Sequence, residues 1–457
     1  MSGNLTPTVA APQLKPRQLL LEMRRTLRVA IPLIVAQLLQ MGNGLVDALV
    51  AGRLGSAQLA AGGIAAGIWF VASILCVGLL AGLSPTLSRL IGQGRRRIVG
   101  GVFRQGLWLG AAVGLCALLC VLLMSATLDH WSLKPELVPY IRQYLITACW
   151  SLPAFAVVMV ARNVLEATGL TRPVMLVQLA GLGINILADL GFGLGWFGLP
   201  RLGLVGIGVA TSVVTVSMAI ALIIVLRRPR FSRYELFSQF DWPQWTTLRS
   251  LLTLSIPIYL TLLFESGLFF ATGVQMGMIG TLEAGAHNIA ISLSGACYML
   301  PLGLSFALTA RTGQVYGRES WPSIRLRVVS GVLLTLLLAL STAIALVLFR
   351  HQLTGLYSTD VAVQALAAQL LVLAAVFQLS DGAQVAFIGL LRGIQDTRVP
   401  MLINAVAYWG IAFPVGYVLA HHVGYGAHGL WYGLIIGLTL SALLQAWRLW
   451  VRLPGLQ

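Results

Sequence analysis

The chain has 457 residues, of which 58% are hydrophobic and 10% are charged, and its mean hydropathy is +0.87. A soluble protein carries about 25% charged residues, so water cannot be the main solvent and a soluble globular fold is excluded. The formal net charge of +16 raises the question of a nucleic-acid partner, which the placement of the basic residues decides.

Residues 1–26 precede the first long apolar stretch and are predicted to form a cytoplasmic tail. From Leu27 almost to the C-terminus, apolar stretches of about 20 residues recur, each long enough to cross a ~30 Å hydrocarbon core as a helix. A helix satisfies its own backbone hydrogen bonds in lipid, and the stretches lack the alternation of a membrane barrel. The first stretch, 27–50, is too long for a signal-peptide core. We therefore predict an all-α integral membrane protein with twelve transmembrane helices.

The basic residues are distributed unevenly between the two sides of the membrane. With the N-terminus in the cytoplasm, 25 of the 30 Lys and Arg residues fall in inner segments. The outer loops hold Arg53, Lys134, Arg142, Arg201 and Arg350. This bias predicts that both termini are cytoplasmic, as in a multi-pass protein of the bacterial inner membrane. Because membrane insertion explains the charge and no basic–aromatic patch is present, no nucleic-acid partner is expected.

The two halves of the chain resemble each other. Ile31-Pro32 recurs as Ile256-Pro257, 225 positions later, and Thr171-Arg172 recurs as Thr397-Arg398, 226 positions later. Three glycines also recur at the separation of 225: Gly55, Gly78 and Gly92 correspond to Gly280, Gly303 and Gly317. Glycine and proline positions are backbone constraints, so a constant offset between them indicates two homologous lobes.

The least hydrophobic internal stretch, 227–249, separates these halves and is predicted to be a cytoplasmic linker that acts as a flexible tether. The N-lobe is then 27–226, the C-lobe is 250–450, and 451–457 is a short cytoplasmic tail. With six crossings each, both lobes begin on the same side, so the repeat is parallel, with a pseudo-two-fold axis along the membrane normal. A ligand is expected to bind between the lobes.

Only four of the 14 acidic residues are predicted to lie deep in the membrane: Asp47, Asp189, Glu265 and Asp381. Placing a carboxylate at the centre of a transmembrane helix costs about 2.5–3.5 kcal/mol on insertion scales, so these residues are candidates for a functional role. Each belongs to a polar stripe at helical spacing. The stripes contain Gln37, Gln40 and Asn43 with Asp47; Gln178 and Asn185 with Asp189; Thr261 and Thr272 with Glu265; and Gln378 and Gln384 with Asp381.

Oxygen-rich stripes of this kind suit a hard cation or a proton. The alternative is that they form interhelical hydrogen bonds, which hold membrane bundles together; for Asn185 the two interpretations are equally supported. No deep Lys or Arg is predicted to neutralise the acids, so the cavity should be negative and suited to cationic cargo. Phe377 and neighbouring aromatic residues could contact such cargo by cation–π interaction, but for any one of them ordinary packing is the favoured interpretation.

Several motifs run through the whole chain: MGNGLVDALVAGRLG, which includes Asp47; SRLIGQG from Ser88 to Gly94; NILAD, which ends at Asp189; LLFESGLFF, which includes Glu265; and SDGAQVAFIGLLRGIQDTRVP from Ser380 to Pro400. By these motifs the chain resembles the multidrug and toxic compound extrusion (MATE) family, most closely its NorM-type branch. The resemblance implies export of cationic or amphipathic drugs and dyes in exchange for Na⁺ or H⁺, through a central cavity that alternates its opening. It implies no other cofactor, and we expect a functional monomer surrounded by lipid.

The same resemblance assigns roles to individual residues. Glu265 and Asp381 match the acids of the family's cation site, where Na⁺ could bind, and Asp47, Asn185 and Asp189 match its first-half polar cluster. The predicted lining of the substrate cavity consists of Gln40, Asn43, Gln178, Thr261, Phe377 and Gln384. Phe377 is also a departure, because NorM-type sequences often have tyrosine there and this chain lacks that hydroxyl.

Other functions are less well supported by the sequence. A flippase for lipid-linked precursors, from the same wider superfamily, predicts a cavity lined by Arg or Lys, whereas the deep charges here are acidic. An intramembrane transferase would need paired acids on one loop, and a major-facilitator transporter would need an Asp near Ser88-Arg89. The chain has no HExxH, GxxxxGK[ST] or GxSxG motif, so we do not expect an enzyme.

Overall fold

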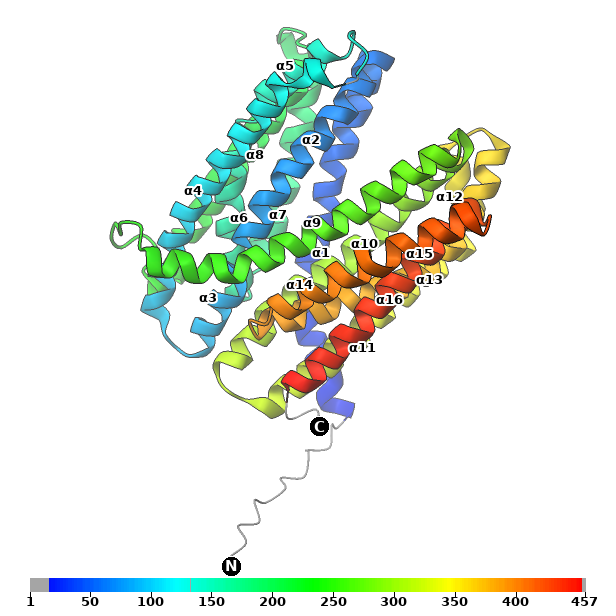
Figure 1. The fold of residues 1–457 in the computed structure, drawn as a ribbon. Coiled ribbons are helices and arrows are strands. Elements are labelled where there is room, and N and C mark those ends of the chain that lie inside the picture. The colour runs from blue at the N-terminus through cyan, green and yellow to red at the C-terminus, as the bar shows by residue number, and fades with distance from the viewer. Residues whose placement is uncertain (1–15, 132, 454–457) are drawn as a thin grey trace, which may run out of the picture.

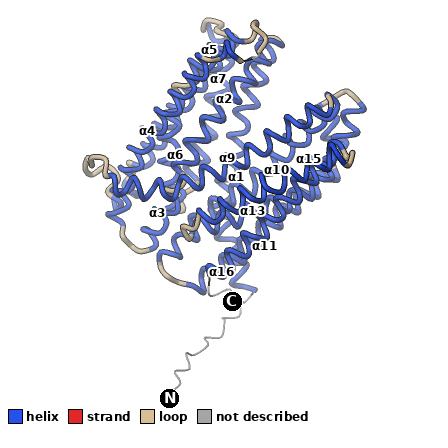
Figure 2. The backbone as a smooth tube through the Cα atoms, viewed as in Figure 1, coloured by secondary structure: helices blue, strands red, loops and turns tan. Residues whose placement is uncertain are grey.

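The computed structural model describes residues 16–131 and 133–453, which form helices without any β-strand (Figure 2). Twelve helical segments in this part of the chain are long and apolar enough to cross a membrane. The prediction of an all-α protein with twelve transmembrane helices is therefore confirmed. Residues 1–15 of the predicted N-terminal tail and 454–457 of the C-terminal tail lie outside the described residues, whereas residues 16–26 already belong to the first helix.

The first half of the chain supplies six of the twelve spans. Its helices are α1 (Pro16–Leu54), α2 (Ser56–Leu80), α3 (Leu83–Gly92), α4 (Arg96–Ala126), α5 (Val138–Ala148), α6 (Ser151–Thr168), α7 (Arg172–Ala188) and α8 (Leu204–Leu226). A π-helical segment, η2 (Asp189–Gly193), continues α7. Short connections are η1 (Leu128–His130), η3 (Trp196–Gly198) and η4 (Pro229–Tyr234).

The second half repeats this arrangement. Its helices are α9 (Trp245–Ile279), α10 (Thr281–Gly317), α11 (Trp321–Leu348), α12 (Arg350–Tyr357), α13 (Val361–Gly393), α14 (Arg398–Ala405), α15 (Phe413–Tyr417) and α16 (Gly426–Arg452). Two π-helical segments, η5 (Val406–Ala412) and η6 (Val418–His422), interrupt the span that begins with α14. Such π-helical turns are rare and frequently mark functional sites.

The sequence repeat corresponds to repeated contacts in space. A Cβ atom added to Gly78 would lie 2.6 Å from the Tyr259 Cα atom, and one added to Gly303 would lie 2.7 Å from the Ile34 Cα atom. These two close approaches are related by the 225-residue offset (303 − 78 = 225 and 259 − 34 = 225). Larger residues would keep these helices apart, so the repeated glycines allow the lobes to pack closely.

The same repeat appears in hydrogen bonds. The Thr171 hydroxyl donates to the Val29 carbonyl oxygen at 2.8 Å, and the Thr397 hydroxyl donates to the Leu254 carbonyl oxygen at 3.2 Å. In each half, the bond therefore ties the start of the fifth span to the first span. The two lobes use equivalent residues for equivalent contacts, as expected for a parallel repeat.

The two lobes form a V in Figure 1. They converge at one end of the molecule, which we call the narrow end. Helix α1 begins there, and α3, α10 and α16 end there. They diverge toward the α1–α2 and α9–α10 turns at Gly55 and Gly280, which we call the wide end. Helices α1 and α9 cross between the lobes: α1 contacts α7 and α10, and α9 contacts α2 and α14. The exact lobe boundaries stay predictions.

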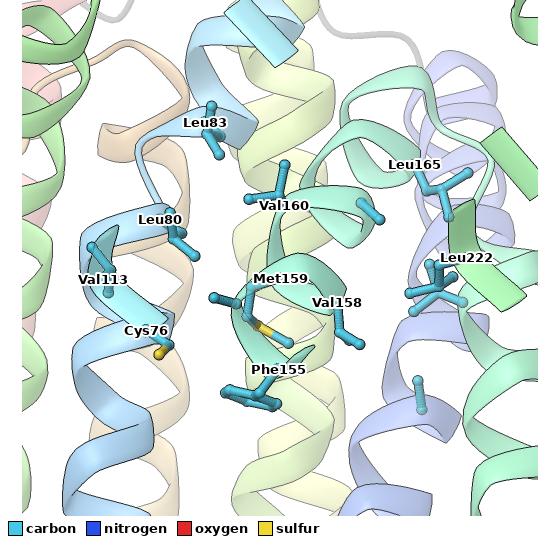
Figure 3. Packing of buried hydrophobic residues seen from close by; sticks show 14 of the residues in the cluster. Cys76, Leu80, Leu83, Val113, Phe155, Val158, Met159, Val160, Leu165 and Leu222 are labelled. Carbon is cyan, nitrogen blue, oxygen red and sulfur yellow. The ribbon is translucent and has the colours of Figure 1, made fainter. Parts of the chain in front are cut away.

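Each lobe has a packed interior and a broad apolar exterior. Figure 3 shows part of the N-lobe interior, where Leu80 on α2, Val113 on α4 and Met159 on α6 are buried together. Large side chains such as Leu123 and Phe270 are instead mostly exposed. Exposed apolar surface on this scale is unusual for a soluble monomer and is what a surrounding bilayer covers.

The linker 227–249 is held against the N-lobe, so the prediction of a flexible tether is wrong. Arg104 on α4 donates to the Asp241 carboxylate at 2.6 Å and to the Glu235 carbonyl oxygen at 2.7 Å. The neighbouring Gln105 side chain donates to the Trp242 carbonyl oxygen at 2.9 Å. These hydrogen bonds attach the segment to α4 of the N-lobe as far as Trp242.

Candidate functional site

The C-lobe brings two of the predicted acids together. Glu265 on α9 accepts a hydrogen bond from the Tyr298 hydroxyl on α10 at 3.0 Å. Asp381 on α13 is 2% exposed, and its buried Oδ1 atom has no hydrogen-bond partner. The two carboxyl groups are close enough for their charges to interact. When both are ionised they repel each other, so a proton or a bound cation would stabilise the pair.

A buried polar network extends from this pair toward the narrow end. The Gln384 amide and the Asn404 amide both donate to the Tyr408 hydroxyl oxygen, the latter at 3.4 Å. Ser441 and Gln445 on α16 both donate to the Asn404 Oδ1 atom, at 2.7 Å and 2.6 Å. Tyr408 lies on the π-helical segment η5, so an irregular stretch of helix carries the central group of this network.

Arg392 corrects the expectation that no deep base is available. It lies three helical turns after Asp381 on α13, and its charge interacts with those of Glu265 and the Tyr298 hydroxyl. The charge of Arg392 and the Tyr298 hydroxyl therefore both act favourably on the Glu265 carboxylate, whereas the charge that acts on Asp381 is that of another acid, Glu265. Of the two carboxylates, Asp381 has the greater need of a proton or an external cation.

The N-lobe contains a second acidic pair. Asp47 on α1 accepts a hydrogen bond from the Asn185 side-chain amide on α7 at 3.0 Å. Asp189, at the start of η2, is 0% exposed, and neither of its carboxylate oxygens receives a hydrogen bond. The Asp47 and Asp189 carboxyl groups are within reach of each other, so one proton could link them. The structure thus brings together the three residues of the predicted first-half cluster.

The predicted lining of the substrate cavity is divided among several environments. Gln40 and Asn43 on α1 are partly buried, and Gln178 on α7 is 8% exposed. The Thr261 hydroxyl donates to the Pro257 carbonyl oxygen of its own helix at 2.8 Å. Gln384 belongs to the network described above. Their role as a lining stays a prediction.

Phe377 is packed inside the C-lobe. It is 2% exposed, and its ring makes edge-on contacts with Phe269 at 6.0 Å and with Trp431 at 5.8 Å between centroids. Of the two interpretations open for this residue, the arrangement matches ordinary aromatic packing.

No group of three or more His, Cys, Asp or Glu side chains that could hold a metal ion occurs within 16–131 and 133–453. A cation at either pair would therefore need hydroxyl, amide or carbonyl oxygens to complete its coordination. The amide and phenol groups around both pairs supply such oxygens. Hydroxyl groups of Tyr298 and Tyr408 lie at the C-lobe pair although Phe377 lacks one.

Sequence reasoning did not identify Tyr298, Tyr408 or Arg392. The two tyrosines lie deep in apolar spans, so the depth of each phenol along its span is the sequence signal that distinguishes them. Because Arg392 lies near the end of its span, the charge distribution counts it among the basic residues of the inner segments. In the structure it belongs to the last turn of α13, where its charge interacts with Glu265.

Comparison with known proteins agrees with this architecture. The MatE family model matches residues 32–190 and 257–418, and the two matches begin 225 positions apart (257 − 32 = 225). A probable multidrug resistance protein NorM of Xanthomonas axonopodis pv. citri is 37% identical over 432 residues, which cover 93% of each chain. The multidrug resistance protein MdtK of Yersinia enterocolitica is 34% identical over 440 residues, covering 94% of this chain and 95% of MdtK.

Solved structures of MATE transporters share the fold. The eukaryotic MATE transporter AtDTX14 superimposes with a TM-score of 0.87 at 18% identity, covering 94% of this chain and 96% of AtDTX14. A multidrug resistance MATE family transporter in an outward-facing conformation gives a TM-score of 0.87 at 20% identity, covering 95% and 96% of the two chains. The family model matches both halves of the chain, and the relatives are more than 30% identical to it. The chain therefore belongs to the MATE family of multi-pass membrane transporters, in its NorM-type branch.

Proposed function

We propose that this transporter exports cationic or amphipathic organic compounds from the bacterial cytoplasm, by alternating access, in exchange for Na⁺ or H⁺. The observation that carries the proposal is the Asp381 carboxyl group, which is buried beside Glu265 with one oxygen unpartnered. A buried charge of this kind is expensive unless a ligand neutralises it. A coupling ion and a cationic cargo are two ligands that could do so in turn.

The arrangement of the lobes supports the alternating-access part of the proposal. The lobes touch at the narrow end and diverge toward the wide end (Figure 1). The positive-inside rule places the narrow end in the cytoplasm, so this arrangement corresponds to an outward-facing state. Rocking of one lobe against the other would then open the opposite side, as in other transporters built from parallel repeats.

The relatives support the cargo class. NorM of Xanthomonas axonopodis pv. citri and MdtK of Yersinia enterocolitica are named as multidrug resistance proteins. We infer a similar broad range of drugs and dyes for this chain. As coupling ion we favour Na⁺, because carboxylate and phenol oxygens from several helices surround the C-lobe pair and suit a hard cation. Protons are the alternative.

Transport into everted membrane vesicles tests the proposal. Everted vesicles that contain the protein should accumulate a cationic dye in their lumen when an imposed Na⁺ gradient drives the exchange. A separately imposed pH gradient is the second arm of the experiment. Glu265→Gln and Asp381→Asn should each abolish this accumulation. Glu136→Gln, which removes an exposed carboxylate outside the spans, should leave it unchanged. Wild-type accumulation by Asp381→Asn at matched expression would refute the coupling role.

A further inference from the structure

Arginines from three helices converge on one buried acid at the narrow end. Glu22 on α1 is 4% exposed and accepts bonds from Arg311 on α10 at 2.6 Å and from Arg327 on α11 at 2.9 Å. Arg25, one turn further along α1, approaches the same carboxylate at 3.9 Å. One negative charge therefore faces three positive charges, and this group of side chains carries a net positive charge.

A cavity lies directly beside this cluster. Its volume is about 290 Å³, and its lining consists of Glu22, Arg25, Val315, Arg318, Ser320, Ser323, Leu326 and Arg327. A second cavity of about 230 Å³ is lined by Leu21, Arg24, Arg25 and Arg28. Arg25 lines both. We call the two together the basic cavity.

Several cations of the basic cavity are not neutralised by the protein. Arg24, Arg28 and Arg318 have no ion-pair partner among the residues that the structure describes, and all three are exposed. These arginines therefore carry donor groups that a ligand could occupy. A guanidinium group recognises phosphate oxygens by paired hydrogen bonds, which makes a phosphate the best-matched anion.

The first turn of α11 adds neutral donors to the same cavity. Ser320 precedes this 28-residue helix, and its hydroxyl donates to the Ser323 hydroxyl at 2.9 Å instead of capping the helix. The free N–H groups at a helix start favour negative charge, as phosphate sites in other proteins do. Here the start of α11 follows the turn that carries Arg318, which has no ion-pair partner among the described residues.

The position of the basic cavity distinguishes a lipid from a soluble anion. It lies where α10 ends and α11 begins, and because α11 is a candidate membrane span, we expect this end of it at the depth of lipid headgroups. Apolar groups adjoin it: Leu326 and Val315 line it, and Leu20 and Leu21 are 65% and 48% exposed on the same stretch of α1. A ligand with a phosphate head and an acyl tail would contact both surfaces.

We propose that the basic cavity binds the phosphate headgroup of an anionic phospholipid from the leaflet at the narrow end. Because the cavity is shared between α1 of the N-lobe half and α10–α11 of the C-lobe half, the bound lipid bridges residues that are far apart in sequence. Juxtamembrane arginine clusters attract anionic lipid by the same electrostatics. The site is separate from the acidic pairs.

Native mass spectrometry of the purified full-length protein, titrated with phosphatidylglycerol or phosphatidylcholine in detergent, tests the proposal. We expect saturable binding of phosphatidylglycerol in preference to phosphatidylcholine. The double variant Arg25→Gln/Arg318→Gln should weaken phosphatidylglycerol binding about tenfold or more, since two charge-assisted contacts are lost. Both residues are exposed, so the variant should fold. The single variant Arg318→Lys keeps the charge but loses the paired hydrogen bonds, so it should bind phosphatidylglycerol less tightly than the wild type and more tightly than the double variant.

A matched control separates a built site from general surface charge. Arg228→Gln/Arg230→Gln removes the same two charges from exposed positions of the linker and should leave binding unchanged. Equal loss of binding in the two double variants would overturn the proposal, as would unchanged binding in Arg25→Gln/Arg318→Gln. Inorganic phosphate is the probe for a soluble ligand: displacement of the lipid by phosphate at equal concentration would overturn the assignment to a lipid.

Discussion

The contact between the lobes at the narrow end depends on two glycines that the repeat relates. A Cβ atom on Gly92, the last residue of α3, would lie 2.1 Å from the Gln314 carbonyl oxygen. A Cβ atom on Gly317, the last residue of α10, would lie 2.2 Å from the Arg89 carbonyl oxygen. Both obstacles are backbone atoms of the other lobe, so rotation of a side chain cannot relieve the overlap.

We therefore expect Gly92→Ala to favour separation of the lobes at the narrow end. Overpacking of a tight contact costs about 1–3 kcal/mol, and here opening of that end removes the overlap. If the full cost applies to the closed state, its equilibrium with the open state shifts by about 5-fold to 150-fold. Gly317→Ala should act in the same direction, because the repeat makes the two contacts equivalent.

Alkylation of a buried cysteine measures this shift. Ser88 is 0% exposed on α3, and its Cβ atom faces Gly313 of the other lobe, so Ser88→Cys should react with maleimide only when the lobes separate. The five native cysteines would first be replaced. The labelling rate of Ser88→Cys should rise in the Gly92→Ala background.

Two alanine variants serve as controls. A Cβ atom on Gly433 would lie 2.5 Å from the Ala412 carbonyl oxygen within the C-lobe, so Gly433→Ala should lower thermal stability without faster labelling. Gly63→Ala meets no atom within 4 Å and should change neither property. If Gly92→Ala labelled no faster than Gly63→Ala, the reasoning about the interlobe contact would be refuted.

Two further predictions concern single side chains. Tyr298→Phe removes the hydrogen bond to Glu265, and because bonds to charged groups contribute about 1.5–3 kcal/mol, the ion concentration for half-maximal efflux should change about tenfold or more; an unchanged value would contradict a role at the site. Arg104→Ala should release the linker and speed its cleavage by trypsin, whereas Arg97→Ala removes only an exposed 3.6 Å pair with Glu235 and should have little effect. Equal cleavage of both variants would show that Arg104 does not hold the linker.

The membrane architecture could be predicted because the lipid hydrocarbon core provides no hydrogen-bond partners for the backbone. Each span must be long and apolar, so the twelve helices follow from hydropathy alone. The repeat could be predicted because Gly78 and Gly303 are fixed by backbone contacts, which keep their positions when other residues change. In both cases one physical constraint acts on a short stretch of sequence.

The rest depends on contacts between distant segments, which a hydropathy profile does not contain. The linker is polar enough to suggest a tether, yet Phe231 and Tyr234 are buried and Arg104 binds its backbone. Arg392 lies near a helix end, yet its charge acts on the Glu265 carboxylate. Its relation to that acid arises from the way α9, which carries Glu265, packs within the C-lobe.

The acids themselves show how far the repeat extends. Glu265 corresponds to Gln40 in the first half (265 − 225 = 40), and Asp47 corresponds to Thr272 in the second half (272 − 47 = 225). The scaffold is therefore symmetric while the charges are not. The two acidic pairs lie at different places in their lobes, so they need not bind the same ligand.

The last prediction is that ions and cationic cargo compete at the acidic pairs. Asp381 and Asp189 are buried with unpartnered carboxylate oxygens, so protons, Na⁺ or a cationic dye should each stabilise them by neutralisation. Raising Na⁺ or lowering the pH should then weaken equilibrium binding of the dye, and by reciprocity the dye should weaken ion binding by the same factor. Fluorescence polarisation of a cationic dye with the purified protein, at constant ionic strength set with choline, measures this effect. Indifference to both ions would exclude direct competition, whereas dependence on pH alone would identify the coupling ion as H⁺ and not the favoured Na⁺.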